Sequence, residues 1–87
     1  MKPRETILVG NYLVSYPTAT TVAIARRCCI TNISSQLLIH QQLDSLMTPT
    51  GKFCDITDGQ YLYTAIIFRK PIFWSRRKIE NTLKQLC

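Results

Sequence analysis

The clearest hydrophobic pattern along the chain lies between residues 21 and 30. Small or apolar side chains recur there at spacings of three and four, which places Ile24, Ala25 and Cys28 on one face of a helix. An alanine in that face lets a following helix cross at short range. Ile30 would then lie in the turn between two helices, so the pattern predicts a helix-turn-helix.

The segment Thr31–Met47 is the second helix of this prediction. Thr31 can cap its start by accepting a hydrogen bond from an unpaired backbone N–H, and neither Pro nor Gly interrupts residues 31–46. The outward side is polar and almost uncharged, and Asn and Gln can make paired contacts to adenine in the major groove of DNA. An ordinary solvated helix surface is the alternative interpretation of the same face, which consists of Asn32, Ser34, Gln36, His40 and Gln41.

Residues 5–16 are expected to form a first, supporting helix. Their apolar stripe consists of Leu8, Tyr12, Leu13 and Tyr16, and Pro17 prevents the helix from continuing. Residues 17–20 would then be a short linker to the helix-turn-helix.

Two strand-like runs follow, at residues 52–56 and 61–68. Both are rich in β-branched and aromatic residues, and the Asp58-Gly59 pair between them is a strong signal for a β-hairpin. A hairpin after three helices is the wing of a winged helix-turn-helix. Its tip is acidic, because it carries Asp55 and Asp58, which argues against a wing that contacts DNA.

The last segment predicts a short helix from about Arg76 to Leu86, with Ser75 as its cap. Ile79, Leu83 and Leu86 give this helix an apolar stripe. The expected fold is therefore α+β, a winged helix-turn-helix with three helices, a hairpin wing and a short C-terminal helix. The 87 residues form a single domain, 1–87, with a core at 1–70 and a basic C-terminal extension at 71–87.

The charge of the chain favours an acidic partner, since eleven Lys and Arg oppose five Asp and Glu and give a net charge of +6. Arg26 and Arg27 would lie near DNA phosphates, although they would equally complement the negative end of a helix. The basic cluster at residues 76–78 begins a helix, where positive charge is unfavourable, and this also favours an acidic partner. The expected DNA contacts are Thr21, Arg26, Arg27, Thr31, Asn32, Ser34, Gln36, His40, Gln41, Lys52, Arg76, Arg77 and Lys78.

The four cysteines favour reduced thiols in a cytoplasm over a disulfide framework. Cys28 and Cys29 are adjacent and Cys87 is the last residue, which is poor geometry for two unstrained bridges. The cysteines and His40 lack the spacing of a metal site, so no metal is expected. The N-terminal apolar run is interrupted by Glu5 and Gly10, and no run is long enough to span a membrane, so a cytoplasmic, nucleoid-associated protein is expected.

The order and spacing of these elements resemble the small winged-helix transcription regulators of enteric bacteria, of the PapI/FaeA and CaiF/GrlA types. In the first type a Thr, then Ile-Ala, an apolar residue, a Val or Ile and a Thr recur, as they do here at Thr21, Ile24-Ala25, Cys28, Ile30 and Thr31. The resemblance implies sequence-specific binding of double-stranded DNA by the helix from Thr31, without catalysis or cofactor. It also implies a bacterial transcription regulator that works with a second regulatory protein.

Two other function classes compete with DNA binding. An enzyme is not expected, because the chain has one His, no catalytic pair of carboxylates and no glycine-rich phosphate loop. A protein-interaction module, an adaptor or inhibitor of another regulator that does not itself bind DNA, is the serious rival, and the acidic hairpin tip favours it. Whether the chain forms a homodimer stays open, since one helix-turn-helix usually needs a second copy or a helper.

Overall fold

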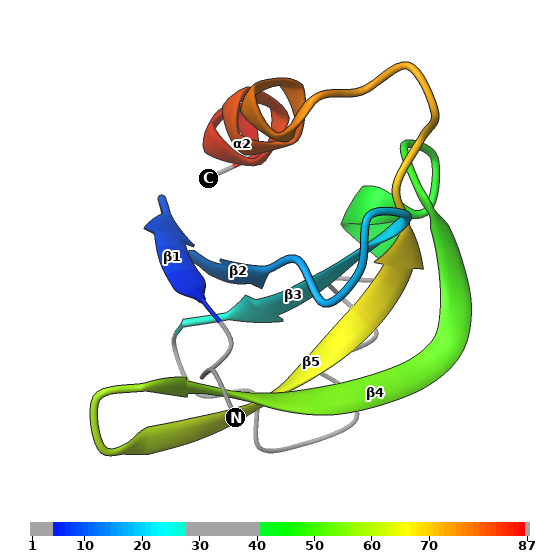
Figure 1. The fold of residues 1–87 in the computed structure, drawn as a ribbon. Coiled ribbons are helices and arrows are strands. Elements are labelled where there is room, and N and C mark those ends of the chain that lie inside the picture. Colours follow the sequence, from blue (N-terminus) through cyan, green and yellow to red (C-terminus); the bar gives the residue numbers. More distant parts are fainter. Residues whose placement is uncertain (1–4, 28–40, 87) are drawn as a thin grey trace.

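A five-stranded antiparallel sheet and one helix make up most of the part of the chain that the computed structural model describes, which is residues 5–27 and 41–86 (Figure 1). The sheet has the order β1-β2-β3-β5-β4. A few helical residues, 41–43, precede β4. The elements are β1 Thr6–Val9, β2 Tyr12–Ser15, β3 Thr21–Arg26, β4 Thr48–Asp58, β5 Tyr61–Arg69 and α2 Arg76–Gln85.

The predicted winged helix-turn-helix is therefore wrong, and the first error is the expected helix at residues 5–16. This segment is the hairpin of β1 and β2, in which Val9 pairs with Tyr12 across a two-residue turn. Gly10 occupies that turn with φ 60°, a conformation that favours glycine and suits a tight hairpin. The β-branched and aromatic side chains on either side pack well on a pleated sheet, and this preference outweighs the helical spacing.

The second error concerns the helix-turn-helix itself. Residues 21–26 form β3, whose four central residues, 22–25, are all buried. A strand buried on both faces shows no alternation of polar and apolar residues, so the spacing of Ile24 and Ala25 fits a helix equally well. Residues 28–40 lie outside the described residues, and the expected helix does not reach Met47, because a turn at residues 44–46 follows the helical residues 41–43.

Two predicted elements are confirmed. The strands at residues 52–56 and 61–68 lie within β4 and β5, and Gly59 adopts φ 62° in the turn that joins them. The C-terminal helix begins after Ser75, whose hydroxyl accepts a hydrogen bond from the Lys78 backbone N–H at 3.2 Å. Both signals are local in sequence, and neither depends on the rest of the fold.

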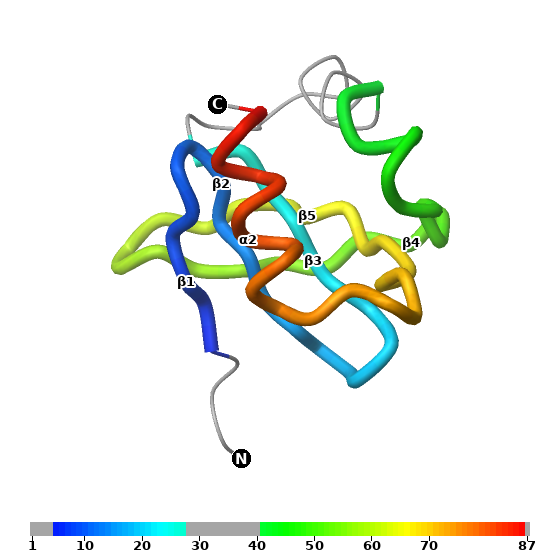
Figure 2. The backbone as a smooth tube through the Cα atoms, turned by 90° about the horizontal axis from the view of Figure 1, so that it is seen from above, coloured from blue at the N-terminus to red at the C-terminus, as the bar shows by residue number. Residues whose placement is uncertain are grey.

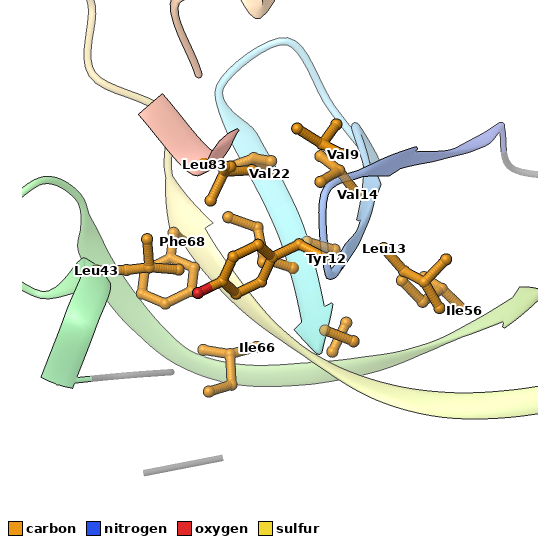
Figure 3. Packing of buried hydrophobic residues seen from close by; sticks show 14 of the residues in the cluster. Val9, Tyr12, Leu13, Val14, Val22, Leu43, Ile56, Ile66, Phe68 and Leu83 are labelled. Atoms are coloured by element: carbon orange, nitrogen blue, oxygen red, sulfur yellow. The ribbon is translucent and has the colours of Figure 1, made fainter. Parts of the chain in front are cut away.

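The sheet is strongly curled, so that β4 also approaches β1, β2 and β3 (Figure 1). Pairing places Leu13, Ala25, Ala65 and Ile56 on the same, concave face, and all four are buried. Inside the curl, Leu13 of β2 lies beside Ile56 of β4 (Figure 3). Small alanine side chains leave the room that lets the sheet fold back on itself.

Helix α2 covers the opposite face of the sheet, close to β1 and β2 (Figure 2). Its buried residues are Ile79 and Leu83, and Leu83 points toward Val22 (Figure 3). Leu43 packs on Phe68 on this face, and the Tyr12 hydroxyl donates a hydrogen bond to Gln42 Oε1 at 2.8 Å. The sheet is therefore covered on both sides, which explains the burial of β3.

We predict that Leu13→Ala lowers the free energy of unfolding by about 2–5 kcal/mol, because it leaves a cavity inside the curl. Leu8 is the control, since it pairs with Leu13 on the same face but is 49% exposed. We expect Leu8→Ala to cost about 1 kcal/mol or less. Urea denaturation of both variants measures the difference, and equal losses of stability would contradict the described packing.

Candidate functional site

A groove of about 720 Å³ lies where β3 begins, β5 ends and β4 begins. The pairing brings these ends together, since Arg69 of β5 stands between Thr21 of β3 and Thr48 of β4. The adjoining loops, at residues 17–20 and 70–75, complete its walls. The lining residues are Pro17, Thr18, Thr20, Thr21, Thr50, Lys52, Ile67, Arg69, Lys70 and Ile72.

Three of its four threonines come from the segment that precedes and opens β3. The Thr18 hydroxyl lies 2.7 Å from that of Thr21 and 3.2 Å from that of Thr20, and it also accepts a hydrogen bond from the Thr20 backbone N–H at 3.2 Å. The Lys70 backbone N–H donates to the Thr20 carbonyl at 2.8 Å, which ties this segment to the end of β5. The hydroxyl groups are thus gathered and held on one wall.

The fourth threonine belongs to an irregularity in β4. Pro49 pairs with Phe68 and Phe53 pairs with Ile66, so the residues of β4 between them, 50–52, stand opposite Ile67 alone. Such a bulge redirects side chains out of the regular alternation of a strand. Gly51 permits it with φ 80°, and the Thr50 hydroxyl donates to the Ile67 carbonyl at 2.8 Å. The bulge thereby places both Thr50 and Lys52 on the groove.

The groove is electropositive. Lys52, Arg69 and Lys70 line it, and none of its lining residues is acidic. Ammonium and guanidinium groups beside several hydroxyls can donate hydrogen bonds to a phosphate or another oxyanion, and such charged hydrogen bonds are the stronger ones. The arrangement therefore suits an anionic ligand with several acceptor oxygens.

The start of α2 carries two cations that lie over aromatic rings. The Arg76 guanidinium lies 4.4 Å from the centre of the Tyr16 ring, and Tyr16 directly precedes Pro17 of the groove wall. Lys78 lies over the ring of Trp74, with its Nζ 5.6 Å from the ring centre. These cation–π contacts stabilise two positive charges at a helix N-terminus, where the helix dipole is unfavourable to them.

Among the residues predicted to contact DNA, the structure brings Thr21 and Lys52 together in the groove. Arg76 lies over the Tyr16 ring and does not line the groove. Arg77 and Lys78 are exposed on the first turn of α2. Gln41 is exposed and helical, whereas the expected contacts Thr31, Asn32, Ser34, Gln36 and His40 lie outside the described residues.

Arg26 and Arg27 lie at the far end of β3, away from the groove. The Arg27 guanidinium forms an ion pair of 3.5 Å with Asp58 at the tip of the β4–β5 hairpin. Arg26 pairs with Tyr12, and its Nε is buried without a hydrogen-bond partner among the described residues. The acidic hairpin tip therefore offsets the positive charge of Arg27, and this end of the sheet is less electropositive than the groove.

Sequence reasoning did not single out most of the groove. Thr18, Thr20 and Thr50 lie in segments that are typical of linkers, and Arg69 and Lys70 belong to a stretch that resembles a basic tail. The only available signal was the density of threonines at residues 18–21 and 48–50. Without the strand pairing, the sequence does not predict that these two stretches lie side by side.

Comparison with known proteins adds no family to this description, since no protein-family model, no curated protein and no solved structure matches the chain. The described residues contain no group of His, Cys, Asp and Glu side chains that would hold a metal ion. Within the same residues, no helix is long and apolar enough to cross a membrane.

The phenol of Tyr16, which lies under Arg76 at the start of α2, has a shifted pKa that can be measured. Burial raises the pKa of its phenol to about 12, the Glu80 carboxylate adds to the rise, and the Arg76 guanidinium opposes it. The folded protein thus favours the neutral phenol. The resulting stabilisation is complete below the unfolded pKa of 10 and is lost as the pH rises from 10 to 12.

We predict that Tyr16→Phe removes this dependence while keeping an aromatic ring beneath Arg76. The free energy of unfolding of the wild type should fall more steeply than that of the variant between pH 10 and pH 12. Urea denaturation of both proteins across that range measures the two slopes. Parallel curves would mean that the Tyr16 phenol is not held in its neutral form by the fold.

Proposed function

We propose that the protein binds nucleic acid through the phosphate backbone, with the groove between β3, β4 and β5 as the phosphate-binding site. The observation that carries the proposal is the combination of four threonine hydroxyls with Lys52, Arg69 and Lys70 in one groove whose lining contains no carboxylate. Protein contacts to phosphate and sugar come mainly from such residues. The net charge of +6 supports the same conclusion, because it attracts a polyanion over a distance.

The groove is suited to a chain of phosphates better than to a single small anion. Its cations come from two strands and a loop, and its volume of about 720 Å³ exceeds what one phosphate would fill. Several phosphates along a strand can therefore be neutralised at once, and each neutralisation releases condensed counterions from the nucleic acid.

DNA remains a partner in this proposal, but the proposed contacts are to its phosphates and not to its base edges. The fold is not a winged helix, so it gives no reason to expect a recognition helix at Thr31–Met47. Leu43 and Met47 of that segment are buried. Phosphate contacts fix position without reading sequence. Sequence-specific regulation of transcription, together with a second regulatory protein, stays a prediction that rests on the resemblance to bacterial regulators.

A protein-interaction module is the second candidate. Strand β4 is an edge of the described sheet, it extends over Thr48–Asp58, and its Phe53 side chain is 55% exposed. An exposed edge strand can accept a strand from a partner. Salt separates the two candidates, because phosphate binding weakens steeply with ionic strength and strand pairing does not.

We predict that neutralising Lys52 and Arg69 by Lys52→Gln and Arg69→Gln weakens binding to mixed-sequence duplex DNA about tenfold at low salt. The variant lacks two cations that would face the phosphates, and the effect is modest because both side chains are exposed to solvent. The slope of log affinity against log salt should flatten by about 0.9 for each phosphate that is no longer neutralised. Fluorescence anisotropy at several salt concentrations measures both quantities.

The matched control removes the same charge elsewhere, with Arg27→Gln at the hairpin end and Lys84→Gln on the last turn of α2. We expect this control to change the affinity only slightly. Equal weakening by both pairs would mean that net charge alone attracts DNA and that the groove is not the site. No binding by the wild type at low salt would reject nucleic-acid binding altogether.

A further inference from the structure

Two apolar side chains at the rim of the groove are almost completely exposed. Ile72 and Phe73 are 93% and 96% exposed, more than any other large hydrophobic residues that the structure describes. Ile72 lines the groove, and Phe73 is the next residue along the chain. An exposed aromatic side chain therefore follows directly on a residue that lines the cationic groove.

The loop that carries these side chains is held at both ends. The Trp74 backbone N–H donates to the Pro71 carbonyl at 3.0 Å, so Ile72 and Phe73 are the two central residues of a tight turn. Before the turn, the Lys70 backbone is bonded to Thr20, and after it Ser75 caps α2. The turn therefore exposes Phe73 to solvent one residue after Ile72 of the groove lining.

We propose that the groove takes single-stranded nucleic acid, with phosphates along Lys52, Arg69 and Lys70 and a base stacked on Phe73. This inference rests on the proposed function and specifies its ligand. Proteins that bind single strands combine a positive groove with aromatic side chains, on which the bases stack. A duplex offers its phosphates but keeps the faces of its bases stacked inside, so it can use the cations and not the ring of Phe73.

An anionic membrane surface would also favour cations next to exposed apolar side chains. A membrane is broad and flat, however, whereas the threonine hydroxyls, Lys52 and Arg69 line a concave groove. A flexible strand can enter such a groove and still reach Phe73 on its rim. The concave shape and the hydroxyl lining therefore favour a strand over a bilayer.

The test compares fluorescein-labelled oligothymidylate of about twelve nucleotides with a mixed-sequence duplex of the same number of phosphates. We expect the wild type to bind the single strand at least about tenfold more tightly than the duplex. Phe73→Leu keeps an apolar side chain but removes the flat ring, and we expect it to weaken the single strand about tenfold without affecting the duplex. Phe73→Trp should restore single-strand binding.

Phe53→Leu is the matched control, because it makes the same change at an exposed phenylalanine of β4 that belongs neither to the turn at residues 71–74 nor to the groove lining. It should bind both ligands like the wild type. The only tryptophan, Trp74, follows Phe73 and supplies a second readout. Its fluorescence should change when the single strand binds to the wild type, and thermal melting should give Phe73→Leu the stability of the wild type, as expected for a side chain in solvent.

Three outcomes would overturn the inference. If the duplex binds in a salt-sensitive way and Phe73→Leu weakens neither ligand, single-strand stacking is rejected while the proposed phosphate site stands. If neither nucleic acid binds at low salt, the proposed function fails together with the inference. If vesicles of phosphatidylglycerol and phosphatidylcholine bind in a Phe73-dependent manner while oligothymidylate does not, the groove faces a membrane instead.

Discussion

The curl of the sheet around small side chains is the constraint on which the rest of the structure depends. Ala25 of β3 and Ala65 of β5 are fully buried on the concave face, and they leave room for Ile56 of β4 to reach Leu13 of β2. A larger side chain at either alanine would force the strands apart, since protein interiors are close-packed. The curl buries the concave face of β3, and α2 together with Leu43 covers its other face.

The groove follows from that curl and from two local features. The bulge at residues 50–52 directs Thr50 and Lys52 into it, and the backbone bond from Lys70 to Thr20 holds the opposite walls together. The segments that carry these features lie far apart in the chain. Strand pairing brings these segments together, so Lys52, Arg69 and Lys70 form one positively charged groove only when the sheet has formed.

The sequence was informative where the signal was local. The Asp58-Gly59 turn and the Ser75 cap each specify an element by chemistry within a few residues, and both elements are present. The apolar run at residues 21–26 was misleading, because a strand covered on both sides loses the alternation that identifies strands. For the site, Thr21 and Lys52 were expected to contact DNA on a different fold, whereas Arg69 could not be placed beside them without the register.

The measurement that tests the proposed binding site most directly is an NMR titration of the labelled protein with oligothymidylate at low salt. We expect amide chemical shifts to change at residues 18–21, 50–52, 69–70 and 72–74, which surround the groove and its rim. The far end of β3 and the hairpin tip, where Arg27 meets Asp58, should change little. Shifts centred on that tip, or on residues 53–57 of β4 beyond the bulge, would contradict this placement of the site and move the binding surface elsewhere.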